Sequence, residues 1–488
     1  MTLPITRAAL ACACACALLA GCASMSGIAP QAQSRNANEL ASQHALSAVS
    51  TSSAAWPKAD WWKAYGDPQL DALIDEALAH SPTLDVAAAR TRKALAVADA
   101  GRSALSPRID ASASSTREHF SEHGLVPPPF GGTTLTLNQM QLALSWDPDV
   151  WGKNRSAYEA ALGSARAAQI DAHAARLQLS TGVAQAYVQL QRAYLQRDVA
   201  QATLAAREKV VALTRDRNAA GLDSRLEVKQ AEAALPATRE EIAALDERIG
   251  LARNQIAALL GAGPDRGLAI ARPAATALAA IALPSRLPAE LLGRRPDIVA
   301  QRWRIEAASK NVESQKAEFY PDVNLLAFVG LQSLGGASLL TAASRMLGAG
   351  PAVTLPVFDA GRLRAQLAAK DADHDVAVDQ YNQTLADAMR EVVDQIVSFR
   401  SLDEQRRQQR DAAATTREAY DLALIRYREG IGNYLQVLSA EQPMLAQQSL
   451  DADLSARALE LSINLVRALG GGYEPEPAQV SMTTGNPR

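Results

Sequence analysis

The sequence predicts a mainly α-helical protein with a small β part, built from two copies of a very long helical hairpin. Three observations support this fold class. No proline interrupts residues 149–235, a single offset of 209 residues relates the two halves of the chain, and two segments between the helical regions show no helical period.

The first hairpin extends from Gly152 to Gly261, with a turn at Gly221. Alanine, leucine, arginine and glutamine dominate its proline-free part, and these residues are strong helix formers. Apolar residues recur at steps of four and three, as in Leu179, Val183, Ala186, Leu190 and Ala193. This is the heptad spacing of helices that pack side by side, so we expect one helix from 152 to 220 and a second that returns to 260.

The second half of the chain repeats this pattern. A shift of 209 residues places Gly152 on Gly361, Gly221 on Gly430, and Gly261 on Gly470, without a gap. Such self-similarity over more than a hundred residues indicates a duplication. The expected organisation is repeat 1 at 56–287, with a β-hairpin at about 108–147, repeat 2 at 288–472, with a β-hairpin at about 322–358, and a flexible tail at 473–488.

Residues 1–21 are expected to be a signal peptide. Arg7 precedes a thirteen-residue apolar run that ends at Ala20, which is too short to cross a bilayer as a helix. The run ends in Leu-Ala-Gly-Cys22, which looks like the lipidation signal of bacterial lipoproteins. The alternative is that Cys22 is just the last of four cysteines in this leader. Lipidation would make residues 22–55, which are rich in serine, alanine, glutamine and asparagine, a tether between membrane and protein.

Four aromatic residues follow the tether, Trp56, Trp61, Trp62 and Tyr65. Such a cluster could bind a ligand, but docking of a helix start against the protein core is the better interpretation. We therefore expect these residues in the core.

The non-helical segments read as four β-strands, around 108–120, 133–147, 322–331 and 350–358. Alternation is clear at Val323, Leu325, Ala327, Val329 and Leu331. Each strand has about the ten residues that a tilted transmembrane strand needs. Four strands are too few for a closed barrel, so three chains would share one of twelve strands. The alternative is two surface hairpins on a body outside the membrane.

The chain carries no recognisable catalytic motif. Its net charge of −3 and aromatic content of 5% do not indicate a nucleic-acid partner. His119 and His123, with Glu118 and Glu122, fall at a strand end and loop rather than on one helix face, so a solvated loop is a better interpretation than a metal site. We expect no enzyme activity and no cofactor besides the lipid on Cys22.

Several short motifs in one order resemble the TolC/NodT-type outer-membrane efflux lipoproteins over nearly the whole chain from Cys22 to Gly472. The matching segments are Trp61-Trp62 with Asp67 and Leu70, Arg294-Arg295-Pro296-Asp297-Ile298, Phe319-Tyr320-Pro321, Pro356-Val357-Phe358-Asp359-Ala360-Gly361-Arg362, Arg426-Tyr427-Arg428-Glu429-Gly430 with Val437-Leu438, and Ala468-Leu469-Gly470-Gly471-Gly472.

The resemblance implies a homotrimer in the cell outer membrane, with a 12-stranded β-barrel above a long periplasmic α-barrel. It implies a passive exit duct of a tripartite efflux system for drugs or other small toxic compounds. The partners would be a periplasmic adaptor and an inner-membrane RND-type pump. Two alternatives stay open, a trimeric periplasm-spanning structural lipoprotein and the outer-membrane component of type I secretion.

The resemblance also assigns roles at the hairpin tips. Residues implied for the tip turns and adaptor contact are Arg217, Gly221, Leu222, Arg426, Tyr427, Gly430 and Gly432. Candidates for a periplasmic gate are Asp421, Leu424 and Arg428. The alternative for any of the charged residues is that it simply solvates a helix end.

Pro236 and Pro443 follow the tip turns by about a dozen residues in each repeat. Each removes a backbone donor and is expected to kink its helix. The kinks could serve as pivots for closure of the tip or be static bends.

Overall fold

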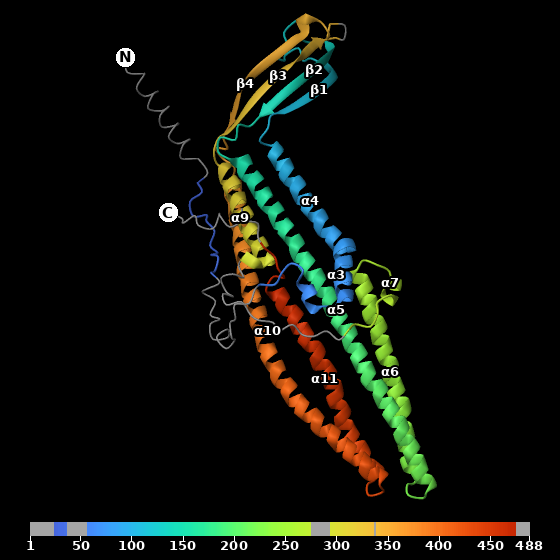
Figure 1. Ribbon diagram of the computed structural model, residues 1–488. Helices are drawn as coiled ribbons and strands as arrows, with labels where there is room; N and C mark the ends of the chain where they lie inside the picture. The colour runs from blue at the N-terminus through green and yellow to red at the C-terminus, as the bar shows by residue number, and fades with distance from the viewer. Residues whose placement is uncertain (1–23, 37–55, 275–292, 336–337, 475–488) are drawn as a thin grey trace. The chain divides into compact units, whose positions relative to one another are not determined.

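A computed structural model of the protein describes residues 24–36, 56–274, 293–335 and 338–474. Within these ranges the chain is mainly helical with one small antiparallel sheet (Figure 1), which confirms the predicted class. The chain divides into two compact units, one of residues 1–34, 90–168 and 300–382, the other of 35–89, 169–299 and 383–488. The predicted lipidation site Cys22 and the signal peptide lie outside the described residues.

The two long helical hairpins are present. Helices α5 (Lys153–Ala219) and α6 (Arg225–Leu259) form the first, and α10 (Arg362–Arg428) and α11 (Tyr434–Ala468) form the second. Pro236 lies inside α6 and Pro443 inside α11. The helix bounds differ from the expected ones by no more than a residue or two, because propensity, the missing prolines and the turn glycines all specify the same ends.

Local sequence explains both tip turns. Gly221 and Gly430 have φ angles of 75° and 79°, in the left-handed region that glycine adopts without a Cβ clash. The Ser224 side chain then caps α6 in a capping box with Glu227, and Asn433 caps α11 by accepting from the Gln436 N–H. These caps satisfy backbone donors that the helix start leaves unpaired.

Shorter elements complete the helical part. They are η2 (Trp61–Tyr65), α3 (Pro68–His80), α4 (Pro82–Ser103), α7 (Pro264–Leu268) and α9 (Pro296–Ala317). The main core of the second unit joins η2 and α3 to α5, α6 and α11. Trp61 and Trp62 are both buried in it, as expected for a core cluster. The Tyr187 hydroxyl donates to Asp67 at 2.7 Å, so the cap residue of α3 is also fixed to α5.

The sheet has four antiparallel strands in chain order, β1 (Arg108–His119), β2 (Thr134–Trp146), β3 (Asp322–Leu334) and β4 (Arg345–Thr354). The two predicted hairpins are therefore joined edge to edge, through β2 and β3. Sequence spacing could not show this pairing, because the two strands are separated by the whole first helical hairpin.

The expected bounds of the last strand were wrong. Strand β4 begins at Arg345, within the stretch that was expected to be a loop, and ends before Pro356. Glycine suggested a loop, but Gly348 lies opposite Phe328, where an added Cβ would come within 2.7 Å of the ring. Here glycine makes room for a neighbouring side chain within a strand.

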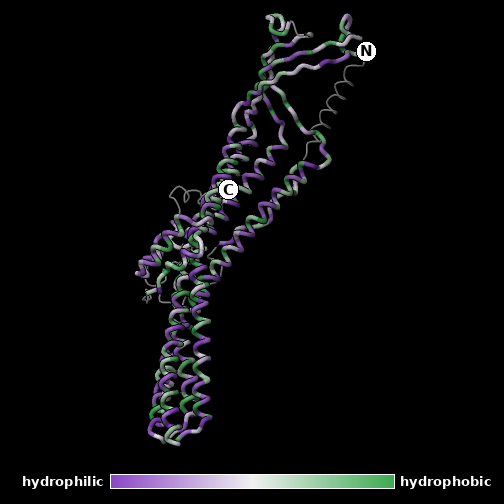
Figure 2. The backbone as a smooth tube through the Cα atoms, turned by 90° about the vertical axis from the view of Figure 1, so that its right-hand side faces the viewer, coloured by the Kyte–Doolittle hydropathy of each residue, from purple (hydrophilic) through white to green (hydrophobic). Residues whose placement is uncertain are grey.

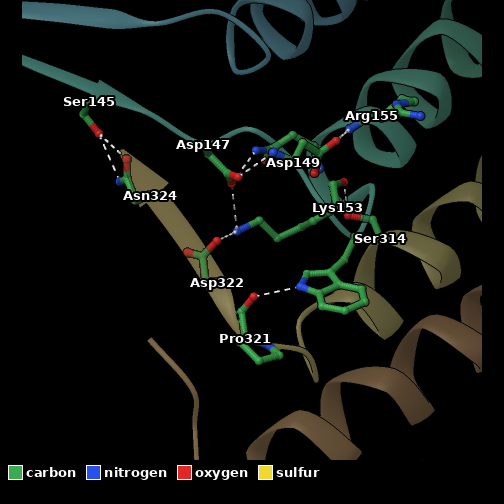
Figure 3. Close-up of polar contacts among 11 residues, drawn as sticks. Ser145, Asp147, Asp149, Lys153, Arg155, Ser314, Pro321, Asp322 and Asn324 are labelled. Atoms are coloured by element: carbon green, nitrogen blue, oxygen red, sulfur yellow. Dashed lines mark hydrogen bonds and ion pairs between the residues drawn. The ribbon is translucent and has the colours of Figure 1, made fainter. Parts of the chain in front are cut away.

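A network of polar contacts fixes the strands to the helix starts of the first unit (Figure 3). The Asp149 carboxylate accepts from the backbone N–H groups of Asn154 and Arg155, both at the start of α5. Lys153 Nζ lies 3.7 Å from Asp147 and 3.4 Å from Asp322 at the start of β3. The network therefore ties the end of β2 and the start of β3 to the first turn of α5.

Residues 24–36 of the predicted tether lie along α10. The Asp375 carboxylate accepts from the backbone N–H groups of Gln31 and Ala32 at 2.9 Å. Arg364 donates to the carbonyls of Ser24 and Ser26. A polar segment that cannot form a core of its own thus gains order by hydrogen bonds to one helix.

Figure 2 shows hydrophilic and hydrophobic residues interleaved along the long helices. None of the helices in the described ranges is long and apolar enough to cross a membrane.

Candidate functional site at the hairpin tips

The tips of the two hairpins are joined by Arg217, Asp223 and Tyr427. The Arg217 guanidinium donates to both carboxylate oxygens of Asp223, from Nε at 2.9 Å and from Nη2 at 3.2 Å. Its Nη1 donates to the Tyr427 carbonyl at 2.8 Å, and its charge lies 4.5 Å from the centre of the Tyr427 ring. The Tyr427 hydroxyl donates to Asp223 and lies 3.0 Å from the Thr214 hydroxyl. We call these four residues the tip network.

The tip network is buried and charged. Tyr427 is fully buried, and Arg217 and Thr214 are buried as well. Burial raises the pKa of Tyr427 to about 12, and its hydrogen bond to Asp223 acts in the same direction. Burial would also raise the pKa of Asp223, but hydrogen bonds from Arg217 and Tyr427 outweigh it, so the pKa of this carboxyl is lowered. Asp223 therefore stays ionised and paired at neutral pH.

A second polar cluster joins α5 to α11 above the tips. Arg207 donates to both carboxylate oxygens of Glu441 at 3.0 Å, and its Nη1 donates to the Thr238 hydroxyl of α6 at 2.7 Å. Glu441 is buried. Bidentate geometry and the extra hydrogen bond offset the cost of removing both charges from water.

Apolar side chains are exposed at matching positions of the two tips. Leu222 and Leu226 on the first tip and Ile431 and Leu435 on the second are between 62% and 68% exposed. The 209-residue offset relates Leu222 to Ile431 and Leu226 to Leu435. Two exposed apolar side chains thus recur at the same places of both tips, which is typical of a surface that contacts another protein.

The residues expected at the tip turns divide into two groups. Gly221, Gly430 and Gly432 form the turns and Leu222 is exposed, whereas Arg217 and Tyr427 are buried beneath them. Arg426 is exposed. We therefore assign Arg217 and Tyr427 a supporting role inside the tip.

The gate candidates are not brought together as one cluster. Asp421 pairs with Arg417, one turn away, at 3.2 Å. Leu424 packs against the apolar cluster of the tip, and Arg428 is exposed. All three lie in the last two turns of α10.

Sequence reasoning missed Asp223, Thr214 and the exposed residues Leu226, Ile431 and Leu435. The sequence did contain a feature that could have identified the exposed residues, because the 209-residue offset matches them in pairs across the two repeats. No such feature identifies Asp223, because its counterpart at that offset is Gly432 and its partner Tyr427 belongs to the other repeat.

In the tip network the Asp223 carboxylate accepts from Arg217 and Tyr427, and the four residues of the network include no histidine or cysteine. Within the described ranges, no group of three or more His, Cys, Asp or Glu residues is placed to hold a metal ion. What the site can do is hold two helical hairpins together and present exposed apolar side chains at their ends.

Comparison with known families gives one match, in two stretches. Residues 73–262 and 287–471 match the outer membrane efflux protein family. The stretches correspond to the two repeats and together make up more than half of the chain.

Curated relatives and solved structures agree with this match. The chain is 42% identical over 379 residues to the fusaric acid resistance protein FusA of Burkholderia cepacia, covering 76% of this chain and 71% of FusA. It is 34% identical over 437 residues to the multidrug resistance outer membrane protein MdtP of Escherichia coli, covering 88% and 89%. The crystal structure of the outer membrane protein VceC of Vibrio cholerae superposes with a TM-score of 0.81 at 39% identity, covering 86% of this chain and all of VceC.

Proposed function

The chain belongs to the outer membrane efflux protein family, and from this we propose that it is the exit duct of a tripartite efflux pump. The family match over both repeats carries the proposal. In it, a periplasmic adaptor and an inner-membrane RND-type pump deliver drugs or other small toxic compounds, and the duct conducts them passively to the exterior. The family consists of efflux ducts and not of enzymes.

The sheet supports a position in the outer membrane. Residues paired across antiparallel strands share one face, and the register places Ala111, Leu142, Val329 and Leu347 in one row. The next row, on the opposite face, is Ser112, Gln141, Gly330 and Met346. An apolar face and a more polar face suit lipid on one side and a water-filled lumen on the other.

The sheet also supports a trimer. Strands β1 and β4 are its two edges, and an open edge carries unpaired backbone groups that a bilayer does not tolerate. Three chains that pair edge to edge would supply twelve strands, a number within the range of known barrels. The long hairpins of the three chains would then form one periplasmic α-barrel.

The tips support docking of an adaptor and a closed resting state. The exposed leucine and isoleucine pairs give an adaptor an apolar surface that occurs twice per chain. The tip network holds the two hairpins of a chain together, so an adaptor that draws them apart must break it. The gate candidates Asp421, Leu424 and Arg428 lie beside this network.

The names of two relatives support the class of compound that we propose the duct conducts. FusA is named for resistance to fusaric acid and MdtP for multidrug resistance. Both point to small toxic compounds, and selection among them is expected in the pump.

Single-channel recording tests the proposal. Purified protein in a planar lipid bilayer should show small, flickering conductance that grows when Asp421→Asn and Arg428→Gln are combined. The matched control neutralises Lys370 and Asp373, an exposed ion pair on the same helix, and should leave the conductance unchanged.

Other results would favour the alternatives. A folded trimer without any conductance would overturn the duct and leave a structural periplasm-spanning lipoprotein. Such a spacer would also be extracted from membranes without detergent once its lipid is removed. Co-purification with a type I secretion exporter, instead of an RND-type pump, would favour that partner.

A further inference from the structure

A cavity of about 250 Å³ lies in the first unit, where the sheet meets the helices. It is lined by residues at the end of β2, the start of β3 and the end of β4, and by residues at the adjoining ends of α5, α9 and α10. Its volume is below the roughly 300 Å³ at which pockets for drug-sized ligands begin. The cavity therefore suits a small polar group better than one of the compounds that the duct is proposed to conduct.

Most charged groups at this cavity already have partners. Lys153 lies between the carboxylates of Asp147 and Asp322, and Asp149 accepts from backbone N–H groups at the start of α5 (Figure 3). The start of α10 is capped in the same way, because the Asp359 carboxylate accepts from two backbone N–H groups there. These groups are satisfied within the chain and need no ligand.

Two opposite charges at the cavity have no ionic partner among the described residues. Arg362 is exposed, and its guanidinium donates to the Gln366 side chain at 2.8 Å but to no carboxylate in the described ranges. Glu318 accepts from the Gln315 amide at 2.9 Å and pairs with none of the described cations. Guanidinium groups bind phosphate well, and a carboxylate accepts hydrogen bonds from an ammonium. A ligand that carries both a phosphate and an ammonium would complete both pairs.

Two stacked aromatic rings also line the cavity. The Trp151 indole lies on the Tyr320 ring, with centres 4.7 Å apart, and its Nε1 donates to the Pro321 carbonyl at 2.8 Å. Trp151 is still 49% exposed and Tyr320 42% exposed. Exposed tryptophan and tyrosine gather at the level of lipid headgroups, because each side chain has an apolar body and a polar end. The pair therefore suits the level at which the sheet would leave the membrane.

The apolar face of the sheet reaches the same cavity. Val323 lines the cavity and lies opposite Val353 in the register, on the face that also carries Val329 and Leu347. Val353, Val329 and Leu347 are between 57% and 79% exposed. Strands β2 and β3 are the inner strands of the sheet, so pairing of its two edges leaves this face open. An acyl chain that lies on the face thus ends at the cavity.

We propose that the cavity holds the phosphoethanolamine headgroup of a membrane phospholipid, with its phosphate at Arg362 and its ammonium at Glu318. The acyl chains lie along the apolar face of the sheet. The inference rests on the membrane position of the sheet in the proposed function. A headgroup without an ammonium, such as phosphatidylglycerol, satisfies Arg362 but leaves Glu318 unpaired, so the site selects between the two lipids.

Native mass spectrometry of the purified, delipidated protein tests the site, with phosphatidylethanolamine and phosphatidylglycerol of the same acyl chains as probes. The protein should retain phosphatidylethanolamine about tenfold better, the factor expected for one hydrogen bond between charged groups. Glu318→Gln should abolish this preference while both lipids are still retained, and Arg362→Gln should lower retention of both. The matched control, Lys370→Gln with Asp373→Asn, removes an exposed ion pair of α10 and should change neither.

Three results would contradict the site. Equal retention of the two lipids by the unmodified protein, or a preference that survives Glu318→Gln, overturns the proposed headgroup. Equal binding of glycerophosphoethanolamine, which has no acyl chains, overturns a phospholipid as the occupant.

A flotation experiment separates this inference from the proposed function. Protein that floats with phospholipid vesicles and conducts, but shows no lipid preference, loses only the headgroup site. Protein that does not float with the vesicles contradicts membrane insertion of the sheet, and the proposed function fails with it.

Discussion

Tyr427 is the side chain through which the two hairpin tips of one chain are joined. Its hydroxyl reaches Asp223 and its carbonyl receives Arg217, so one residue of the second repeat satisfies two charged groups of the first. Because the pKa of Tyr427 is raised and that of Asp223 is lowered, the proton remains on the tyrosine and the hydrogen bond is charge-assisted.

Tyr427→Phe should shift the equilibrium of the tip from closed towards open, while the phenyl ring keeps the apolar packing of the tip. Loss of a hydrogen bond to a charged group costs about 1.5 kcal/mol or more, which corresponds to a roughly tenfold increase in the ratio of open to closed tips. The measurement is open probability in single-channel records of the purified protein.

Tyr434→Phe is the control for this change. Tyr434 lies in the same apolar cluster, with its ring 6.1 Å from that of Tyr427, and its hydroxyl makes no hydrogen bond with the described residues. Equal effects of the two substitutions would show that packing, and not the hydrogen bond to Asp223, holds the tip.

The helices α5 and α11 depend on the pair Arg207 and Glu441. Both side chains are largely buried, so removing one partner leaves an uncompensated charge, at a cost of about 3–5 kcal/mol. We expect Glu441→Ala and Arg207→Ala each to lower the apparent melting temperature of the protein by several degrees.

The double substitution Arg207→Met with Glu441→Leu should recover most of that loss, because the buried charges disappear together. Apparent melting curves of the two single variants and the double variant, recorded at one heating rate, measure the coupling. Additive effects would mean that the two side chains do not stabilise the interface as a pair.

The whole molecule is expected to be attached to the membrane twice, through its lipid and through its strands. Cys22→Ala should abolish incorporation of labelled palmitate. The protein should nevertheless stay in the membrane fraction until detergent is added, because the sheet and not the lipid would hold it there. Release of the variant by buffer alone would contradict membrane insertion of the strands.

The sequence alone was sufficient to predict the helical hairpins, their turns and the duplication. Helix length follows from local propensity and the absence of proline, and the turns follow from Gly221 and Gly430, so neither needs long-range information. The family could be recognised for the same reason, since its motifs are short and lie at turns and helix ends.

Only the tertiary structure decided which groups meet. The pairing of β2 with β3, the contact of Asp223 with Tyr427, and the docking of residues 24–36 on α10 join residues far apart in the chain. Burial and hydrogen-bond geometry select such partners, and neither leaves a period or spacing in the sequence. The offset of 209 residues shows which positions are equivalent, but only the folded chain shows that Val188 is covered while Val397 is not.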